Sequence, residues 1–374
     1  MKKMLLFSAI ALLFIGCSTK SDTLKVNYIC EGILCSEVIS LDFIGDDNRI
    51  RSPYIDSVGF CYLDSLSYPD NNPDHYTQYT TPYKLDFSKT IEPYSQEYYC
   101  AYTVHNIIKV IEYYNRLFDN KIDFNAQEKY RTIDVAFGDA SMLTHPNFYI
   151  FEENSNPSPT LFAHEIGHRA FWYLEDPTGI KFNGLSLVHM GLLEYFTVSL
   201  YDTPLVGEGC LPVKTVRDAS VLHKYPIDST YNLRHTFKLL EESYPAELQN
   251  PKNNISKYLS TSYAYYGDDI LDKYYDNHRG AMILTGTLWR IREQMGQEDT
   301  DKLIAQTIMN LNVYMDKRND FFISDINSLP DQIDWCDVFY GLIQKDKELY
   351  DGKNIQTIVA EFTKTGYPVD LIKY

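Results

Sequence analysis

The sequence predicts an α+β protein with a mixed N-terminal half and a mainly helical C-terminal half. Residues 23 to 98 alternate short apolar runs with clusters of Asp, Asn, Pro and Ser, a pattern typical of strands joined by turns. Beyond Cys100 the apolar residues recur at helical spacing instead. The chain has 374 residues, 44% of them hydrophobic and 14% aromatic, so it can bury a large core and is unlike a disordered protein.

Individual elements follow from the same patterns. Four apolar residues between Val104 and Ile111 share one helical face, so we expect a helix over 99–118. The segments 131–137 and 147–151 are β-rich and bounded by turn residues, and they are predicted to be neighbouring strands. Further helices are expected at 159–174, 187–201, 231–243, 254–265, 280–295 and 299–315.

The charge balance excludes one class of partner. The chain carries 34 Lys and Arg against 51 Asp and Glu, a formal net charge of −17. Nucleic-acid binding depends on clustered Lys and Arg, and the sequence contains no such cluster. We therefore expect no nucleic acid as a partner, and the acidity bears on solubility rather than on chemistry.

The first residues predict export and lipid attachment. Two lysines precede an apolar stretch, 5–15, that is too short to span a bilayer. A glycine and Cys17 end this stretch in a way that resembles a bacterial lipobox, which implies removal of a leader at 1–16 and a lipid on Cys17. We expect 17–25 to be a tether and the protein to be a lipoprotein of the bacterial cell envelope, at the outer membrane or the cell surface.

The remaining six cysteines bear on disulfides rather than on metal binding. An even number in an exported protein permits up to three disulfides. Cys30 and Cys35 are close enough in sequence to close a small loop, and whether they pair stays open. The spacings include no paired CxxC, so a zinc site built from cysteines is not expected.

The segment HEIGH, from His164 to His168, is the strongest indication of chemistry. Ser158 suits a helix N-cap and Pro159 suits the first helical position, so the motif is predicted to lie on a helix. Residues four apart are separated by about 40° around a helix and by about 6 Å along it, so both imidazoles can reach one ion. Zinc suits two neutral imidazoles, a carboxylate and a water, and Glu165 beside that water is expected to be the general base.

The third zinc ligand is expected on a later helix. Leu174 stands where a metzincin carries its third histidine, so that class is excluded. Glu194 is the next useful carboxylate on a helix after His168. By contrast, Glu175 and Asp176 lie at the end of the active-site helix and are expected to be solvated or turn residues.

Over residues 95–320 the chain resembles the gluzincin metallopeptidases, the thermolysin- and fungalysin-like group. In that family HExxH is followed by a helix reading Glu-Gly-x-x-Asp/Glu-aromatic, whose first acid binds zinc and whose second acid orients a zinc histidine. Gly191 and the aromatic residues Tyr195 and Phe196 match this pattern. Met190 stands at the ligand position, and Glu194 stands at the orienting position.

This departure leaves two alternatives for the predicted zinc ligands His164, His168 and Glu194. In the first, Glu194 has become the direct ligand after a shift of helix register. In the second, it orients one of the two imidazoles, and the site is weakened or is completed by another group such as His189. A thioether is a soft, neutral and poor zinc ligand, so Met190 is expected to pack in the core.

A second resemblance to fungalysin-like enzymes lies at Asp276-Asn-His278 and the apolar helix that follows, with Ala281 at the position of a family glycine. It implies that His278 donates a hydrogen bond to the oxyanion of the tetrahedral intermediate. Asp276 or Asp272 is the candidate to orient this imidazole. The alternative is a histidine at a helix N-terminus without a task.

The strand at 133–137 resembles the edge strand on which this family lays its peptide substrate. That role implies main-chain hydrogen bonds to the substrate and a broad tolerance of sequence. Val135 stands where the family usually has asparagine. From its pattern alone, the segment is equally consistent with an ordinary core strand.

Together these resemblances imply a zincin-like fold with the active-site helix between the two halves. We expect a leader at 1–16, a tether at 17–25, a β-rich region at 26–98 and a gluzincin-like peptidase domain at 99–374. The implied function is a zinc-dependent endopeptidase that uses Zn²⁺ to hydrolyse peptide or protein substrates. The alternatives are a non-catalytic descendant that binds peptides or surface ligands, supported by the departures above, and a glycan-binding lipoprotein suggested only by the tyrosine content.

Overall fold

The computed structural model describes residues 23–30, 33–45, 50, 52–62, 91–125, 131–138, 142–145, 148–152, 157–180, 187–207, 217–222, 277–321, 333–367 and 369–374. Predictions for Cys17, for the helices at 231–243 and 254–265, and for Asp272 and Asp276 lie outside these ranges. Among the helices within them, none is both long enough and apolar enough to cross a membrane.

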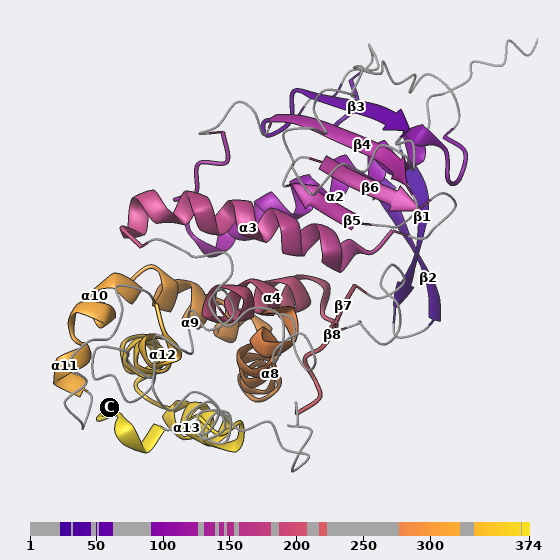
Figure 1. The fold of residues 1–374 in the computed structure, drawn as a ribbon. Coiled ribbons are helices and arrows are strands. Elements are labelled where there is room, and N and C mark those ends of the chain that lie inside the picture. Colours follow the sequence, from indigo (N-terminus) through magenta and orange to yellow (C-terminus); the bar gives the residue numbers. More distant parts are fainter. Residues whose placement is uncertain are drawn as a thin grey trace, which may run out of the picture.

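A four-stranded mixed sheet forms the N-terminal half (Figure 1). Its strands, in order across the sheet, are β3 (Ser57–Tyr62), β4 (Thr132–Gly138), β6 (Phe148–Glu152) and β5 (Met142–His145). β4 pairs in parallel with both β3 and β6, and β5 pairs antiparallel with β6. The prediction that 131–137 and 147–151 are neighbouring strands is therefore confirmed.

The prediction that 133–137 is an edge strand is wrong. β3, from a much earlier segment, pairs with one side of this strand, and β6 pairs with the other side. Ile133 and Val135 are fully buried, as is Tyr149 on β6. The alternative of an ordinary core strand is the correct one, and within the described sheet the outer position beside β6 belongs to β5.

A β-hairpin precedes the sheet in the sequence, and Cys30 and Cys35 lie on its two strands. It consists of β1 (Thr23–Cys30) and β2 (Ile33–Ser40), which pair antiparallel. Their register does not place Cys30 directly opposite Cys35. Cys100 and Cys336 are buried as thiols, so the three disulfides that the cysteine count permits do not all form.

Helices make up most of the remaining structure. They are α2 (Gln96–Leu117), α3 (Pro159–Thr178), α4 (Leu187–Tyr201), α8 (Asn277–Met295), α9 (Gln297–Ile308), α10 (Leu311–Asp316), α11 (Arg318–Phe321), α12 (Trp335–Tyr350) and α13 (Ile355–Lys364), with a 3-10 turn at Val369–Leu371. The helices expected at 99–118, 159–174, 187–201 and 280–295 are confirmed. The single helix expected at 299–315 is wrong, because the chain turns between α9 and α10 at Asn310.

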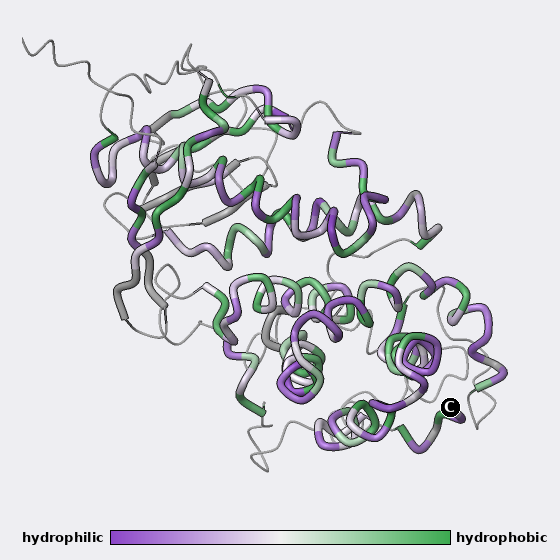
Figure 2. The backbone as a smooth tube through the Cα atoms, turned by 180° about the vertical axis from the view of Figure 1, so that it is seen from behind, coloured by the Kyte–Doolittle hydropathy of each residue, from purple (hydrophilic) through white to green (hydrophobic). Residues whose placement is uncertain are grey.

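α3, the helix that carries HEIGH, lies between the two halves of the molecule. α3 contacts α2 and β5 on one side and α4 on the other (Figure 1). α4 is buried on all sides from Val188 to Ser199, as expected for a helix at the centre of a large protein. The outer helices of the C-terminal half mix hydrophilic and hydrophobic residues along their length (Figure 2), consistent with one buried face each. The α+β prediction is confirmed at this level.

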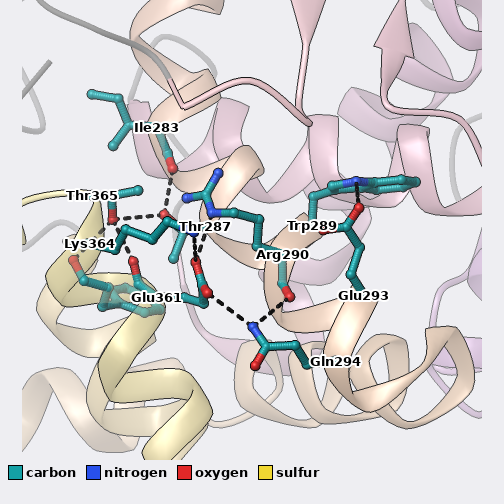
Figure 3. Close-up of polar contacts among 10 residues, drawn as sticks. Ile283, Thr287, Trp289, Arg290, Glu293, Gln294, Glu361, Lys364 and Thr365 are labelled. Atoms are coloured by element: carbon teal, nitrogen blue, oxygen red, sulfur yellow. Dashed lines mark hydrogen bonds and ion pairs between the residues drawn. The ribbon is translucent and has the colours of Figure 1, made fainter. Parts of the chain in front are cut away.

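Polar contacts join α8 to α13 (Figure 3). Arg290 Nε donates to Glu361 Oε2 at 2.8 Å, and Gln294 Nε2 donates to Glu361 Oε1 at 3.0 Å. One turn away, Thr287 Oγ1 donates to Thr365 Oγ1 at 3.0 Å. These contacts hold α8, the helix that begins with the predicted oxyanion histidine, against the C-terminal helix.

Close packing of α4 against α8 explains Gly191. A Cβ at this position would lie 2.8 Å from Leu284 Cβ and 3.1 Å from the carbonyl oxygen of Ala281. Overpacking of this kind costs about 1–3 kcal/mol, which exceeds the ~1 kcal/mol that alanine gains over glycine in a helix. We therefore expect Gly191→Ala to lower the free energy of unfolding in urea by about 1 kcal/mol, the typical difference between these two effects.

The control for this substitution is Lys302→Ala on the exposed face of α9, which should change stability by less than about 0.5 kcal/mol. A Gly191→Ala protein as stable as the native chain would show that the two helices can separate without cost.

Asp301 on α9 links three helices, α2, α4 and α9, through hydrogen bonds. Its carboxylate accepts hydrogen bonds from Tyr113 of α2 at 2.9 Å, and from Tyr195 and Ser199 of α4 at 2.7 and 2.6 Å. Burial raises the pKa of Asp301 above its usual value, although these hydrogen bonds oppose the rise.

This raised pKa predicts how Asp301→Asn changes stability with pH. The folded chain holds the Asp301 proton more tightly than the unfolded chain does. Its contribution to stability is therefore complete below the unfolded pKa of about 3.9 and is lost as the pH rises through the folded pKa. Asparagine does not titrate, so the native chain should exceed the variant in stability by more at pH 4 than at pH 8. Urea denaturation at both pH values measures this difference, and an equal difference at both would contradict it.

Candidate functional site

The HEIGH motif lies on α3 as predicted. The rings of His164 and His168 are 4.9 Å apart between centroids and perpendicular, with an interplanar angle of 89°. Pro159 begins the helix. The Ser158 side chain does not cap it, contrary to the prediction, and its Oγ instead lies 3.1 Å from Thr160 Oγ1.

Glu194 contacts the Nδ1 side of the His164 ring. Its Oε1 is 3.2 Å from His164 Nδ1 and 2.8 Å from a terminal nitrogen of Arg217, and the Glu194 side chain is completely buried. Arg217 belongs to β8 (Arg217–Asp218), which pairs with β7 (Leu205–Val206) directly after α4. This contact matches the alternative in which Glu194 orients an imidazole, and direct ligation by Glu194 stays a prediction.

His189 contacts the second imidazole of the motif. Its Nε2 lies 3.0 Å from His168 Nδ1, and the two rings stack with centroids 5.1 Å apart. Burial, helped by nearby His164, lowers the pKa of His189 to about 3, so its ring is neutral and carries one donor and one acceptor nitrogen. Each HEIGH histidine therefore has its Nδ1 against a partner from α4.

Glu165 lies on the other side of His164. Its Oε1 is 4.0 Å from His164 Nε2, and 22% of its side chain is exposed. Burial raises the pKa of Glu165 to about 8; the positive charge of Arg217 opposes this rise and the negative charge of Glu194 adds to it. A carboxyl group with such a pKa can take up and release a proton near neutral pH.

Other residues of α4 within the motif region, including Met190 where the motif has an acid, have packing roles. Met190 is buried with 3% of its surface exposed, in agreement with the expectation that it packs. Tyr195 donates its hydroxyl hydrogen bond to Asp301, and Phe196 packs edge-on against the ring of Tyr113. These contacts hold α4 in place and so position Glu194 beside α3.

His278 is the second residue of α8. Its side chain, with the proposed partners Asp276 and Asp272, lies outside the side chains that the structure describes. Its role as an oxyanion donor stays a prediction.

The described donors do not complete a metal site by themselves. Within the ranges given above, no group of three His, Cys, Asp or Glu side chains is placed so that it could hold a metal ion. His164 and His168 supply the two nitrogen donors that zinc favours.

Arg217 is the site residue that the sequence analysis missed. It lies between stretches outside the described ranges and belongs to no motif. Only its contact across the fold with Glu194 identifies it.

Comparisons with family models and with curated proteins found no match to this chain. The likeness to gluzincins therefore depends on the motif from His164 to His168 and on the pattern of α4.

Proposed function

We propose that this chain is a zinc-dependent endopeptidase of the gluzincin type, with a zincin-like fold, anchored to the cell envelope by a lipid on Cys17. The observation that carries the proposal is the pairing of each HEIGH imidazole with a partner from α4. Glu194 faces Nδ1 of His164, and His189 faces Nδ1 of His168. Histidines that bind metals usually engage their second nitrogen in this way, because the contact sets the tautomer and the ring orientation.

The two imidazoles fit zinc through their Nε2 atoms. When bound, zinc supplies a Lewis acid that polarises the peptide carbonyl and lowers the pKa of water. Glu165 accepts a proton from the attacking water and passes it to the amine nitrogen as the carbon–nitrogen bond breaks. By resemblance, His278 donates a hydrogen bond to the oxyanion. Arg217 and Glu194 hold the His164 ring in place.

The test begins with the native chain. The mature protein is purified, zinc per chain is counted, and casein cleavage is measured before chelation, after chelation and after zinc is restored. We expect close to one zinc per chain and cleavage that depends on it. A zinc-free protein that cleaves nothing, even with added zinc, would contradict the proposal.

Glu194→Gln distinguishes the two roles of this carboxylate. If Glu194 orients His164, the variant should still take up one zinc per chain, with an affinity about 10–100-fold lower. Loss of stoichiometric zinc at saturation would show direct ligation instead. Zinc titration against a fluorescent competitor measures the affinity, and Glu112→Gln on the exposed face of α2 is the control.

A non-catalytic protein that binds peptides is the second candidate. Met190 favours it, because this residue stands where the family motif has its zinc-binding acid. It predicts peptide binding by a protein that neither retains zinc nor cleaves casein. The experiment on the native chain separates the two candidates.

A further inference from the structure

From Pro159 to Glu175, the residues of α3 that reach solvent form one stripe. Between Pro159 and Glu175 all residues are buried except Leu161, Glu165, His168, Trp172 and Glu175. Successive members are four, three, four and three residues apart, which places them on one helical face. The predicted general base and one predicted zinc ligand therefore share this stripe with Trp172.

Trp172 is the most exposed member of the stripe. It is one of the large hydrophobic residues that remain exposed, with 37% of its surface accessible to solvent. The chain has three tryptophans, and the other two, Trp289 and Trp335, are each only 5% exposed. The Trp172 indole lies beside His168, with ring centroids 6.2 Å apart and an angle of 30° between the planes.

We propose that Trp172 is a specificity-determining residue that packs against a large apolar side chain of the peptide substrate. This inference rests on the proposed peptidase function. A substrate that reaches Glu165 and His168 lies along this stripe, and Trp172 is its next member. The indole offers apolar area that an apolar side chain can cover, with gain from the water released.

The distance between His168 and Trp172 along α3 limits which substrate side chain Trp172 can contact. Trp172 lies one turn beyond His168, about 6 Å along the axis. An extended peptide advances about 3.3 Å per residue. The selected side chain is therefore within about two residues of the scissile bond. Glu175 follows Trp172 on the stripe, one turn further along α3. An acidic substrate side chain at this position is disfavoured by like-charge repulsion.

Tryptophan fluorescence tests the contact without turnover. In Glu165→Gln, acrylamide should quench mainly Trp172, because the other two indoles are buried. A saturating peptide with phenylalanine near the scissile bond should reduce this quenching severalfold, whereas the same peptide with glutamate in that place should not. Trp172→Phe should remove most of the quenchable signal and so identifies its source.

Cleavage kinetics supply the second readout. Trp172→Ala should lower kcat/KM for the phenylalanine peptide by about tenfold, through KM, and leave an alanine peptide unaffected. Trp172→Phe should restore most of the preference. Trp172 is exposed on the helix, so the variants should fold as the native chain does.

The outcomes separate this inference from the proposed function. If the native chain cleaves nothing, the peptidase proposal fails, while protection of Trp172 by the phenylalanine peptide still supports the contact. Cleavage without side-chain preference, or equal protection by both peptides, overturns the inference. Protection by oligosaccharides and not by peptides also overturns it, in favour of a glycan-binding surface.

Discussion

Glu165→Gln should lower kcat/KM for casein by about 10²–10⁴-fold while leaving the zinc content unchanged. Glutamine has the shape of glutamate but cannot accept the proton of the attacking water. Glu165 is suited to this task because its carboxylate lies 4.0 Å from His164 Nε2 and remains partly open to solvent. The measurement is initial cleavage rate against substrate concentration, with zinc counted on the same samples.

Glu112→Gln, on the exposed face of α2, is the control for removing one carboxylate and should cleave at the native rate. If Glu165→Gln retained full activity, Glu165 would not be the base. Cleavage would then depend on another group, or on a contaminating enzyme.

Arg217→Met should lower the free energy of unfolding by about 3–5 kcal/mol. Arg217 and Glu194 are both buried, and a guanidinium nitrogen lies 2.8 Å from the carboxylate. Methionine removes the cation and leaves the Glu194 charge buried without it, which costs much more than an exposed ion pair gains. Urea denaturation of the native chain and the variant measures the loss.

Arg131→Met is the matched control. Arg131 Nε donates to Asp56 Oδ2 at 2.8 Å, but Asp56 is exposed, so this loss should be about 1 kcal/mol or less. Adding Glu194→Gln to Arg217→Met should cost less than the sum of the single losses, because the unpaired charge is then removed as well. Losses that add fully would show that the two side chains do not stabilise one another.

The elements near the site could be predicted because their signals are local. The helix expected at 187–201 matches α4 at both ends, and Pro159 begins α3. The spacing of His164 and His168 on one helical face follows from helix geometry alone. A pattern within one segment is sufficient for each of these predictions.

Predictions that depended on distant segments failed or stayed open. The strand at 133–137 resembles an edge strand, yet β3 from residues 57–62 pairs with it. Nothing within the strand records which other segment will pair with it, because a core strand and a strand beside a substrate have similar compositions. In the same way, the position of α4 relative to α3 decided that Glu194 contacts the Nδ1 atom of His164.

The sequence by itself determined the α+β class and the helix that carries His164, Glu165 and His168. Only the tertiary structure decided that Glu194 and His189 face the imidazole Nδ1 atoms, that Arg217 balances Glu194, and that Trp172 remains exposed. The physical reason is the range of the forces involved. Helical periodicity acts within a few residues, whereas burial and ion pairing depend on segments that become neighbours only when the chain folds.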